Sequence, residues 1–240
     1  MSEPVISPVS GPTPLKISEI FESLQGEGVS TGAPCVFVRL AQCNLHCSWC
    51  DTKYTWDFER YRYEDEVRER SAAEVAAVVN ASPSRRLVLT GGEPLLQQRA
   101  LKVFFAALAP DITVEVETNG TIVPEPSTLA RVNQWNVSPK LQNAGDPEHF
   151  RIRPEVLAML RDSGHAYLKL VVGGDADYAE AEALVRRLAW PSARVLLMPE
   201  ASNREQLRER SPGVAEAAHS RSFRFSSRLH LELWGGRRGT

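Results

Sequence analysis

The stretch CVFVRLAQCNLHCSWCDT, residues 35–52, joins an apolar run to a loop that contains three cysteines. Its first part, 35–41, lacks a strict apolar-polar alternation, and only Arg39 interrupts the apolar residues before Leu40. Such runs are typical of strands that are covered on both faces, as in parallel sheets. Because the cysteines follow directly, we expect them at the carboxyl end of a buried strand.

Similar apolar runs recur along the chain, at 86–90, 112–118, 134–138, 166–172 and 193–199. Helices are predicted between them, at 71–80, 96–109, 154–163 and 175–189. The pairs Ser71 with Glu74 and Ser202 with Glu205 have capping-box spacing, which predicts helix starts at both places. This alternation of about six strands with helices predicts an α/β fold with a parallel sheet, either barrel-like or doubly wound.

Polar or Gly-rich segments follow several of these strands. They are TGGEP (90–94), ETNGT (117–121), SPK (138–140) and the pair Pro199-Glu200. Turn chemistry by itself explains any one of them. Parallel α/β folds, however, build their sites from the loops at the carboxyl ends of strands. The four segments together therefore predict a site on one rim.

The composition is ordinary for a soluble globular protein of 240 residues, with 42% apolar and 24% charged residues. The 28 basic and 30 acidic residues give a net charge of -2, which predicts neither nucleic acid nor a membrane as partner. No segment has the pattern of a secretory signal or the length of a transmembrane helix. We expect a flexible arm at 1–14, one domain at 15–240, and a cytoplasmic location where thiols stay reduced.

The spacing C-x3-C-x2-C allows one loop to bring three thiolates around a compact inorganic centre. Iron–sulfur clusters normally take four cysteines, so three would leave one iron free to bind a small molecule. Zinc is the alternative, and it would need His46 or the distant Cys35 as a fourth ligand. Cys35 lies in the predicted strand, where a cysteine is more often a small buried apolar residue. The aromatic and charged segment 53–70 is expected to cover the cysteine loop.

The cysteine spacing resembles the signature of the radical S-adenosylmethionine superfamily, and TGGEP resembles its GGEP element. The finer resemblance is to the 7-carboxy-7-deazaguanine synthase family. It rests on ESLQGEG (22–28), Arg39, CDT (50–52), TGGEP, ETNGT and SPK in that order, across about residues 18–200.

This resemblance implies a partial, incomplete parallel βα barrel that holds a 4Fe–4S cluster and S-adenosylmethionine. S-adenosylmethionine chelates the cluster's open iron, and an electron from the cluster cleaves its sulfonium to yield a 5'-deoxyadenosyl radical. That radical takes a hydrogen from 6-carboxy-5,6,7,8-tetrahydropterin. The reaction is a ring contraction to 7-carboxy-7-deazaguanine with loss of ammonia, a carbon–nitrogen lyase reaction of queuosine and deazapurine biosynthesis.

The resemblance also implies residue roles. The cluster ligands are Cys43, Cys47 and Cys50, and Thr52 binds Mg2+ with the substrate carboxylate. The implied substrate contacts are Leu24, Gln25, Gly26, Glu27, Arg39, Thr90 and Glu117. The implied S-adenosylmethionine contacts are Trp49, Cys50, Asp51, Gly92, Ser138, Pro139, Lys140, Met198 and Glu200. Lys169, within an apolar run, is either buried and paired or faces the site.

Two departures from the family stand out. Met198 occupies a position where the family often has Gln, and a thioether cannot replace two amide hydrogen bonds. The last residues differ from members whose terminal Pro carboxylate contacts substrate. We therefore carry over no contact from the C-terminal segment, while His230 stays a candidate.

The family implies a small-molecule pterin substrate, a reductant protein such as a flavodoxin or ferredoxin, and a homodimer. One rival is a glycyl-radical activating enzyme of the same superfamily, which would share the cysteines and GGEP. That function gives no reason for LQGEG, CDT and SPK together. A rival of another class is a zinc-stabilised binding module, which iron and sulfide analysis would exclude.

Overall fold

One curved sheet runs through the computed structural model, which describes residues 13–240. The predicted arm 1–14 lies outside the described residues except for Thr13 and Pro14. In this part of the chain the strands are β1 Leu15–Leu24, β2 Pro34–Leu40, β3 Arg68–Arg70, β4 Arg86–Gly91, β5 Thr113–Thr118, β6 Gln134–Val137, β7 Ala166–Val172, β8 Val195–Pro199 and β9 Arg224–Phe225. Their order is β3-β1-β2-β4-β5-β6-β7-β8-β9. All neighbours from β2 to β9 are parallel, whereas β1 pairs antiparallel with both β2 and β3.

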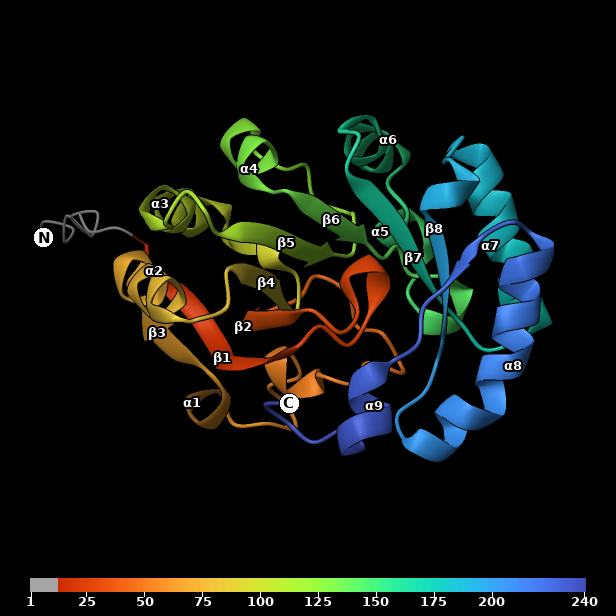
Figure 1. Ribbon diagram of the computed structural model, residues 1–240, viewed down its shortest axis with the longest axis horizontal. Helices are drawn as coiled ribbons and strands as arrows, with labels where there is room; N and C mark the ends of the chain where they lie inside the picture. The colour runs from red at the N-terminus through yellow and green to blue at the C-terminus, as the bar shows by residue number, and fades with distance from the viewer. Residues whose placement is uncertain (1–12) are drawn as a thin grey trace, which may run out of the picture.

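The described residues also form helices. They are α1 Tyr63–Glu66, α2 Ala72–Ala81, α3 Gln98–Ala107, α4 Pro126–Arg131, α5 Glu148–Arg151, α6 Pro154–Asp162, α7 Asp175–Arg187, α8 Arg204–Ser220 and α9 Leu229–Trp234. Figure 1 shows α2, α3, α4, α6, α7 and α8 along the outer side of the arc, while α9 and the C-terminus lie on the other side. The sheet does not close, because β3 and β9 are its two edges. The predicted partial βα barrel is therefore confirmed.

Alternate residues of each parallel strand face two different environments. Val36 and Val38 of β2, like Val114 and Val116 of β5, belong to the large apolar core against the helices. The residues between them face the interior of the partial barrel. On β5 to β7 three of these interior residues are polar and almost fully buried: Glu115, Asn136 and Lys169. Buried polar groups require partners, and an interior built from them is a binding site rather than a second core.

Strand β1 was not predicted from the sequence, and a bulge explains why. Leu15 and Ile17 are buried, as an alternating strand requires. The register with β2 then shifts between Ile17 and Glu19. An extra residue reverses which side chains face inward, so one alternation does not run through the whole strand. The short edge strands β3 and β9 also lacked a pattern long enough to detect.

The six predicted strands are present as β2 and β4 to β8, and the predicted helices as α2, α3, α6, α7 and α8. The capping box at the start of α2 is confirmed, because Ser71 Oγ accepts from Glu74 N at 3.2 Å and Glu74 Oε2 accepts from Ser71 N at 2.9 Å. The second box is wrong by one residue. Asn203 caps α8, and its side chain accepts from Gln206 N at 2.9 Å. Of the helices in residues 13–240, none combines the length and apolarity needed to span a bilayer.

The C-terminal segment crosses the open side of the barrel and contacts the loop after β1. Leu229 N donates to Gly26 O at 2.8 Å, and Gly28 N donates to Ser226 Oγ at 2.8 Å. A side chain at Gly26 would collide with His230, because a Cβ there would lie 2.4 Å from His230 Nδ1. Glycine at this position therefore allows the two distant segments to form one wall.

Candidate active site

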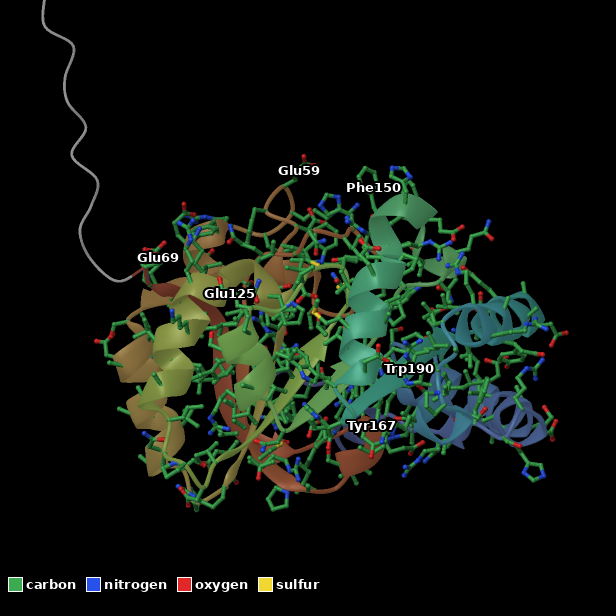
Figure 2. The ribbon with its side chains drawn as sticks, turned by 90° about the horizontal axis from the view of Figure 1, so that it is seen from above. Glu59, Glu69, Glu125, Phe150, Tyr167 and Trp190 are labelled. Atoms are coloured by element: carbon green, nitrogen blue, oxygen red, sulfur yellow. The ribbon has the colours of Figure 1, made fainter. Side chains whose placement is uncertain are left out.

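A cavity lies at the carboxyl ends of the parallel strands, inside the partial barrel. Every predicted site residue except Pro139 lines it, as do the segments that follow β2, β4, β5, β6 and β8. Pro139 is buried and does not line the cavity. Figure 2 shows Glu59 and Phe150 at the edge where these strands end, and Tyr167, near the start of β7, toward the opposite edge. The predicted convergence of the strand ends on one rim is thus observed.

The cysteine loop is held by the segment that follows β6. Ser48 N donates to Ala144 O at 2.8 Å, and Trp49 Nε1 donates to Asn143 Oδ1 at 3.1 Å. Within the loop, Cys50 N donates to Cys47 O at 3.2 Å. Nothing in the sequence of Gln142–Ala144 indicated this supporting role, because the contact joins residues about a hundred positions apart.

The two glycines of TGGEP allow β4 to pass directly beside the start of the cysteine loop. A Cβ at Gly91 would lie 2.2 Å from Leu40 O, and one at Gly92 would lie 2.0 Å from Gln42 O. Gly91 also has a φ of +148°, a conformation that favours glycine. The GG pair is therefore required by close backbone packing next to Cys43.

Glu93 joins the ends of β4 and β5. Its carboxylate accepts from Leu95 N at 3.0 Å, from Thr118 Oγ1 at 2.9 Å and from Asn119 N at 2.7 Å. Burial raises the pKa of the Glu93 carboxyl despite these bonds. The residue faces away from solvent and fixes the two loops at the rim of the cavity.

The three cysteines of the loop are free thiols that share an apolar cluster with Leu45, Trp49 and Ala144. Burial raises the pKa of the Cys43 thiol to about 12 and that of the Cys47 thiol to about 11. Trp56 Nε1 donates to Cys50 Sγ at 3.4 Å, so the segment after the loop does cover it as predicted. Soft thiolate ligands in an apolar pocket suit an iron–sulfur cluster.

The zinc alternative finds little support in these contacts. His46 is exposed and stacks on Trp56, with the ring centroids 4.8 Å apart. Cys35 is fully buried beside Phe37 and Val88, which confirms it as a small apolar residue. In residues 13–240 no three His, Cys, Asp or Glu side chains converge on a single metal ion. The cysteines of a cubane cluster bind separate irons and need not converge on one point.

Lys169 combines both roles that the sequence left open, since it is buried, paired and lines the cavity. Its ammonium donates to Glu27 and lies 3.6 Å from Glu117 Oε1. Burial alone would lower the pKa of Lys169, but the Glu117 and Glu27 carboxylates hold that pKa above its ordinary value. Thr90 Oγ1 donates to Glu117 Oε2 at 2.9 Å, so β4 and β7 hold this carboxylate of β5 from two sides.

A second set of buried polar contacts, centred on Glu115, positions Gln25. Gln25 Nε2 donates to Glu115 Oε1 at 2.7 Å, and Gln25 Oε1 accepts from Glu27 N at 3.2 Å. Glu115 also accepts from Asn136 Nδ2 at 2.5 Å and from Ser30 Oγ at 2.6 Å. The amide of Gln25 therefore has one orientation, and it fixes the turn that carries Gly26 and Glu27.

Arg39 reaches the cavity from β2, where Glu19 accepts from its Nε at 2.8 Å. Tyr54 Oη donates to the same carboxylate at 2.8 Å, and Arg238 Nε donates to it at 3.1 Å. Burial acts to raise the pKa of Glu19, but these donors and cations lower the pKa below its ordinary value. Arg39 is thus held by an ionised partner.

The predicted cofactor side is lined by residues from β6 and β8. Lys140 Nζ donates to Ser138 Oγ at 3.0 Å and lies 5.5 Å from the centre of the Trp49 ring. Met198 is buried in the wall, and Glu200 pairs with Arg210 at 3.2 Å. Thr52 Oγ1 lies 3.6 Å from Cys50 Sγ, one of the three loop thiols.

Sequence reasoning missed Arg228, which lines the cavity from the C-terminal segment, and it left His230 only as a candidate. Burial lowers the pKa of His230, which lines the same wall. Neither residue belongs to a motif or a strand end. Their position depends on how the C-terminal segment folds back across the barrel, which no local pattern encodes.

An open α/β barrel with three cysteines at a strand end is the architecture of radical S-adenosylmethionine enzymes. Residues 38–203 match the family model described as Radical SAM superfamily. A 7-carboxy-7-deazaguanine synthase of Pyrobaculum aerophilum is 40% identical over 226 residues, which cover 94% of this chain and 97% of that protein. The synthase of Halobacterium salinarum is 35% identical over 92% of this chain and 90% of its own. The chain therefore belongs to the radical SAM superfamily and, within it, to the 7-carboxy-7-deazaguanine synthase family.

Solved structures agree with this assignment. The crystal structure of QueE from Escherichia coli has a TM-score of 0.69 and 27% identity, covering 90% of this chain and 95% of that one. Streptococcus suis SuiB bound to S-adenosylmethionine has a TM-score of 0.53 at 13% identity, over 77% of this chain and 48% of that chain. The second likeness concerns the fold alone.

Proposed function

We propose that this protein is a 7-carboxy-7-deazaguanine synthase, a radical S-adenosylmethionine lyase that converts 6-carboxy-5,6,7,8-tetrahydropterin to 7-carboxy-7-deazaguanine with loss of ammonia. Relatives with this activity in their name match over nearly their whole length. One observation carries the proposal. A single cavity is lined both by three cysteine thiols and by a set of polar side chains that hydrogen bonds hold in place.

The cluster end fits a 4Fe–4S centre held by Cys43, Cys47 and Cys50. Its donor set is three soft sulfur atoms, and the Trp56 N–H points at one of them. Together with S-adenosylmethionine, such a cluster supplies the one-electron chemistry that starts a radical reaction. The protein's part is to bind, orient and shield. Trp49, Asp51, Gly92, Ser138, Lys140, Met198 and Glu200 line this end and are the proposed contacts of S-adenosylmethionine.

The other end suits a pterin carboxylate. Among the described residues Arg39 makes one side-chain hydrogen bond, through Nε to Glu19, so its terminal N–H groups can bind a carboxylate in a bidentate manner. Glu117 offers acceptors for the N–H edge of an amino-pyrimidinone ring. The orientation of both groups is fixed before substrate enters, which lowers the entropy lost on binding. Leu24, Gln25, Gly26, Glu27 and Thr90 complete this proposed pocket.

The magnesium ion stays a proposal, with Thr52 Oγ1 as its protein ligand. Mg2+ prefers oxygen ligands and keeps several waters, so one hydroxyl suffices when a substrate carboxylate also binds. Pro139, which lies off the cavity, stays a predicted cofactor contact. The predicted flavodoxin or ferredoxin reductant, the homodimer and the cytoplasmic location are likewise proposals from the family resemblance. The position of the cavity inside the partial barrel supports a small-molecule substrate over the glycyl residue of a partner protein.

The test is anaerobic turnover. We expect protein reconstituted with iron and sulfide, given reductant, Mg2+, S-adenosylmethionine and the carboxytetrahydropterin, to form a product with the mass of 7-carboxy-7-deazaguanine. Cys47→Ala should form none, whereas the matched variant Cys35→Ala should keep its cluster and its activity. Omitting Mg2+ tests the proposed requirement for the cation in the same assay.

Other outcomes would separate the rivals. Reductive cleavage of S-adenosylmethionine without conversion of the pterin would keep the superfamily and reject the substrate. One zinc per chain without iron or acid-labile sulfide would reject the enzyme altogether.

A further inference from the structure

Arg228 lines the cavity and contacts both Glu27 and Asp51, although it comes from a segment that carries no recognised motif. It precedes α9, and its side chain is 8% exposed. A buried guanidinium requires several partners to offset its loss of hydration. The identity of those partners indicates what the residue does.

The guanidinium contacts three segments that are distant in sequence. Its Nε donates to Glu27 Oε1 at 3.0 Å, its Nη2 donates to the Asp51 carboxylate, and its Nη1 donates to Ala201 O. Glu27 is in the turn after β1, Asp51 directly follows the cysteine ligand Cys50, and Ala201 follows β8. The rigid fork of Arg holds these acceptors at fixed separations, which a flexible Lys could not do.

The two carboxylates do not depend equally on Arg228. Glu27 also pairs with Lys169, so it keeps one cation if Arg228 is removed. Across residues 13–240, Arg228 is the one cation within ion-pair distance of Asp51. Asp51 is also the more exposed of the two, at 48% against 14% for Glu27. Its position beside the cluster loop therefore depends on Arg228.

We propose that Arg228 is a positioning residue that links the pterin pocket, through Glu27, to the S-adenosylmethionine pocket, through Asp51, so that binding of either ligand strengthens binding of the other. This rests on the proposed function, which assigns the two pockets. A ligand that orders Asp51 also orders Arg228, and through it Glu27. By linkage, the factor by which each ligand raises the affinity for the other is the same.

The test is calorimetric and needs no turnover. The carboxytetrahydropterin is titrated into reconstituted enzyme with its cluster kept oxidised, with and without S-adenosylmethionine. Wild type should bind the pterin more tightly when S-adenosylmethionine is present, within the roughly 5- to 150-fold range usual for coupled sites. Arg228→Gln should bring that ratio close to one. The control Arg208→Gln, which removes a surface contact with Glu232 of α9, should leave the ratio unchanged.

A ratio retained in Arg228→Gln, or absent from the wild type, would overturn the proposal. If Arg228→Gln does not fold, Asp51→Asn decides instead, because it removes the negative charge that pairs with Arg228. The ratio should then fall in Asp51→Asn, and an unchanged ratio would reject the link. Product formation by the wild type is scored separately, so a failure of the proposed function is distinguishable from a failure of this link.

Discussion

At the scale of single residues, the contact between Trp56 and Cys50 has an electronic consequence. The indole N–H donates to Cys50 Sγ at 3.4 Å. Hydrogen bonds to cluster sulfurs stabilise the more negative reduced state and so raise its reduction potential. Trp56→Phe keeps an aromatic ring over the loop and removes the donor.

We predict that Trp56→Phe lowers the midpoint potential of the reconstituted cluster by about 40 mV, if the bond contributes about 1 kcal/mol to a one-electron couple. The measurement is a redox titration followed by electron paramagnetic resonance. Trp234→Phe, at an exposed position on α9, is the control and should leave the potential unchanged. Equal potentials in Trp56→Phe and wild type would show that the indole does not act on the cluster.

At the same scale, the sequence predicted residues that belong to local motifs. Gly92 and the three cysteines were correctly placed at the cavity, because close backbone packing and the predicted cluster ligation require these residue types at fixed spacings. Arg228 was not found, since a lone arginine before a short helix is ordinary in any sequence. Its role comes from contacts with Glu27 and Asp51, each more than 170 positions away.

At the scale of elements, the hydrogen bonds at the start of α8 show which of Ser202 and Asn203 caps the helix. Asn203 Oδ1 accepts the Gln206 backbone N–H, whereas Ser202 contacts only the Gln206 side chain. A capping side chain satisfies a backbone donor that the first turn leaves unpaired.

We predict that Asn203→Ala lowers the free energy of unfolding by about 1 kcal/mol, while Ser202→Ala changes it by less than about 0.5 kcal/mol. Urea denaturation of the two variants and wild type measures this. Ser71→Ala, at the cap of α2, serves as the positive control. A larger loss in Ser202→Ala than in Asn203→Ala would restore the assignment made from sequence.

The elements themselves were largely predictable. Buried parallel strands such as 166–172 are apolar on both faces, so their composition alone marks them. β1 was not predictable, because its bulge and its half-exposed faces remove any single periodicity. The start of α8 was off by one because Ser202 and Asn203 are both good caps, and the choice between them depends on the direction in which β8 leads the chain.

At the scale of the whole molecule, the paired carboxylates of the barrel interior determine stability in acid. Burial would raise the pKa of Glu27, but Lys169 and Arg228 outweigh burial and hold that pKa well below its ordinary value. The unfolded chain then binds this proton more readily than the folded chain does. The contribution of Glu27 is fully present above its ordinary pKa of 4.5 and is lost as the pH falls below it.

Glu115 contributes with the opposite sign. Burial raises the pKa of Glu115, so its protonation favours the folded state as the pH falls toward 4.5. Below pH 4.5 the effect of Glu27, whose pKa is lowered, dominates.

We predict that Glu27→Gln loses less free energy of unfolding than wild type between pH 4.5 and pH 3, by up to about 1.4 kcal/mol per pH unit. Urea denaturation at several pH values gives the slopes. The exposed Glu59→Gln is the control, and an acid slope of Glu27→Gln equal to that of wild type would contradict the assignment.

The wall formed where Leu229 meets Gly26 and Ser226 meets Gly28 has a consequence for synthesis of the protein. The chain leaves the ribosome with its N-terminus first, so the cysteine loop emerges long before residues 226–229. Until those residues appear, one side of the cavity is missing, and a cluster inserted there would be exposed to solvent and oxygen. Assembly of the metal centre is therefore best timed after translation ends, when the finished chain can shelter it.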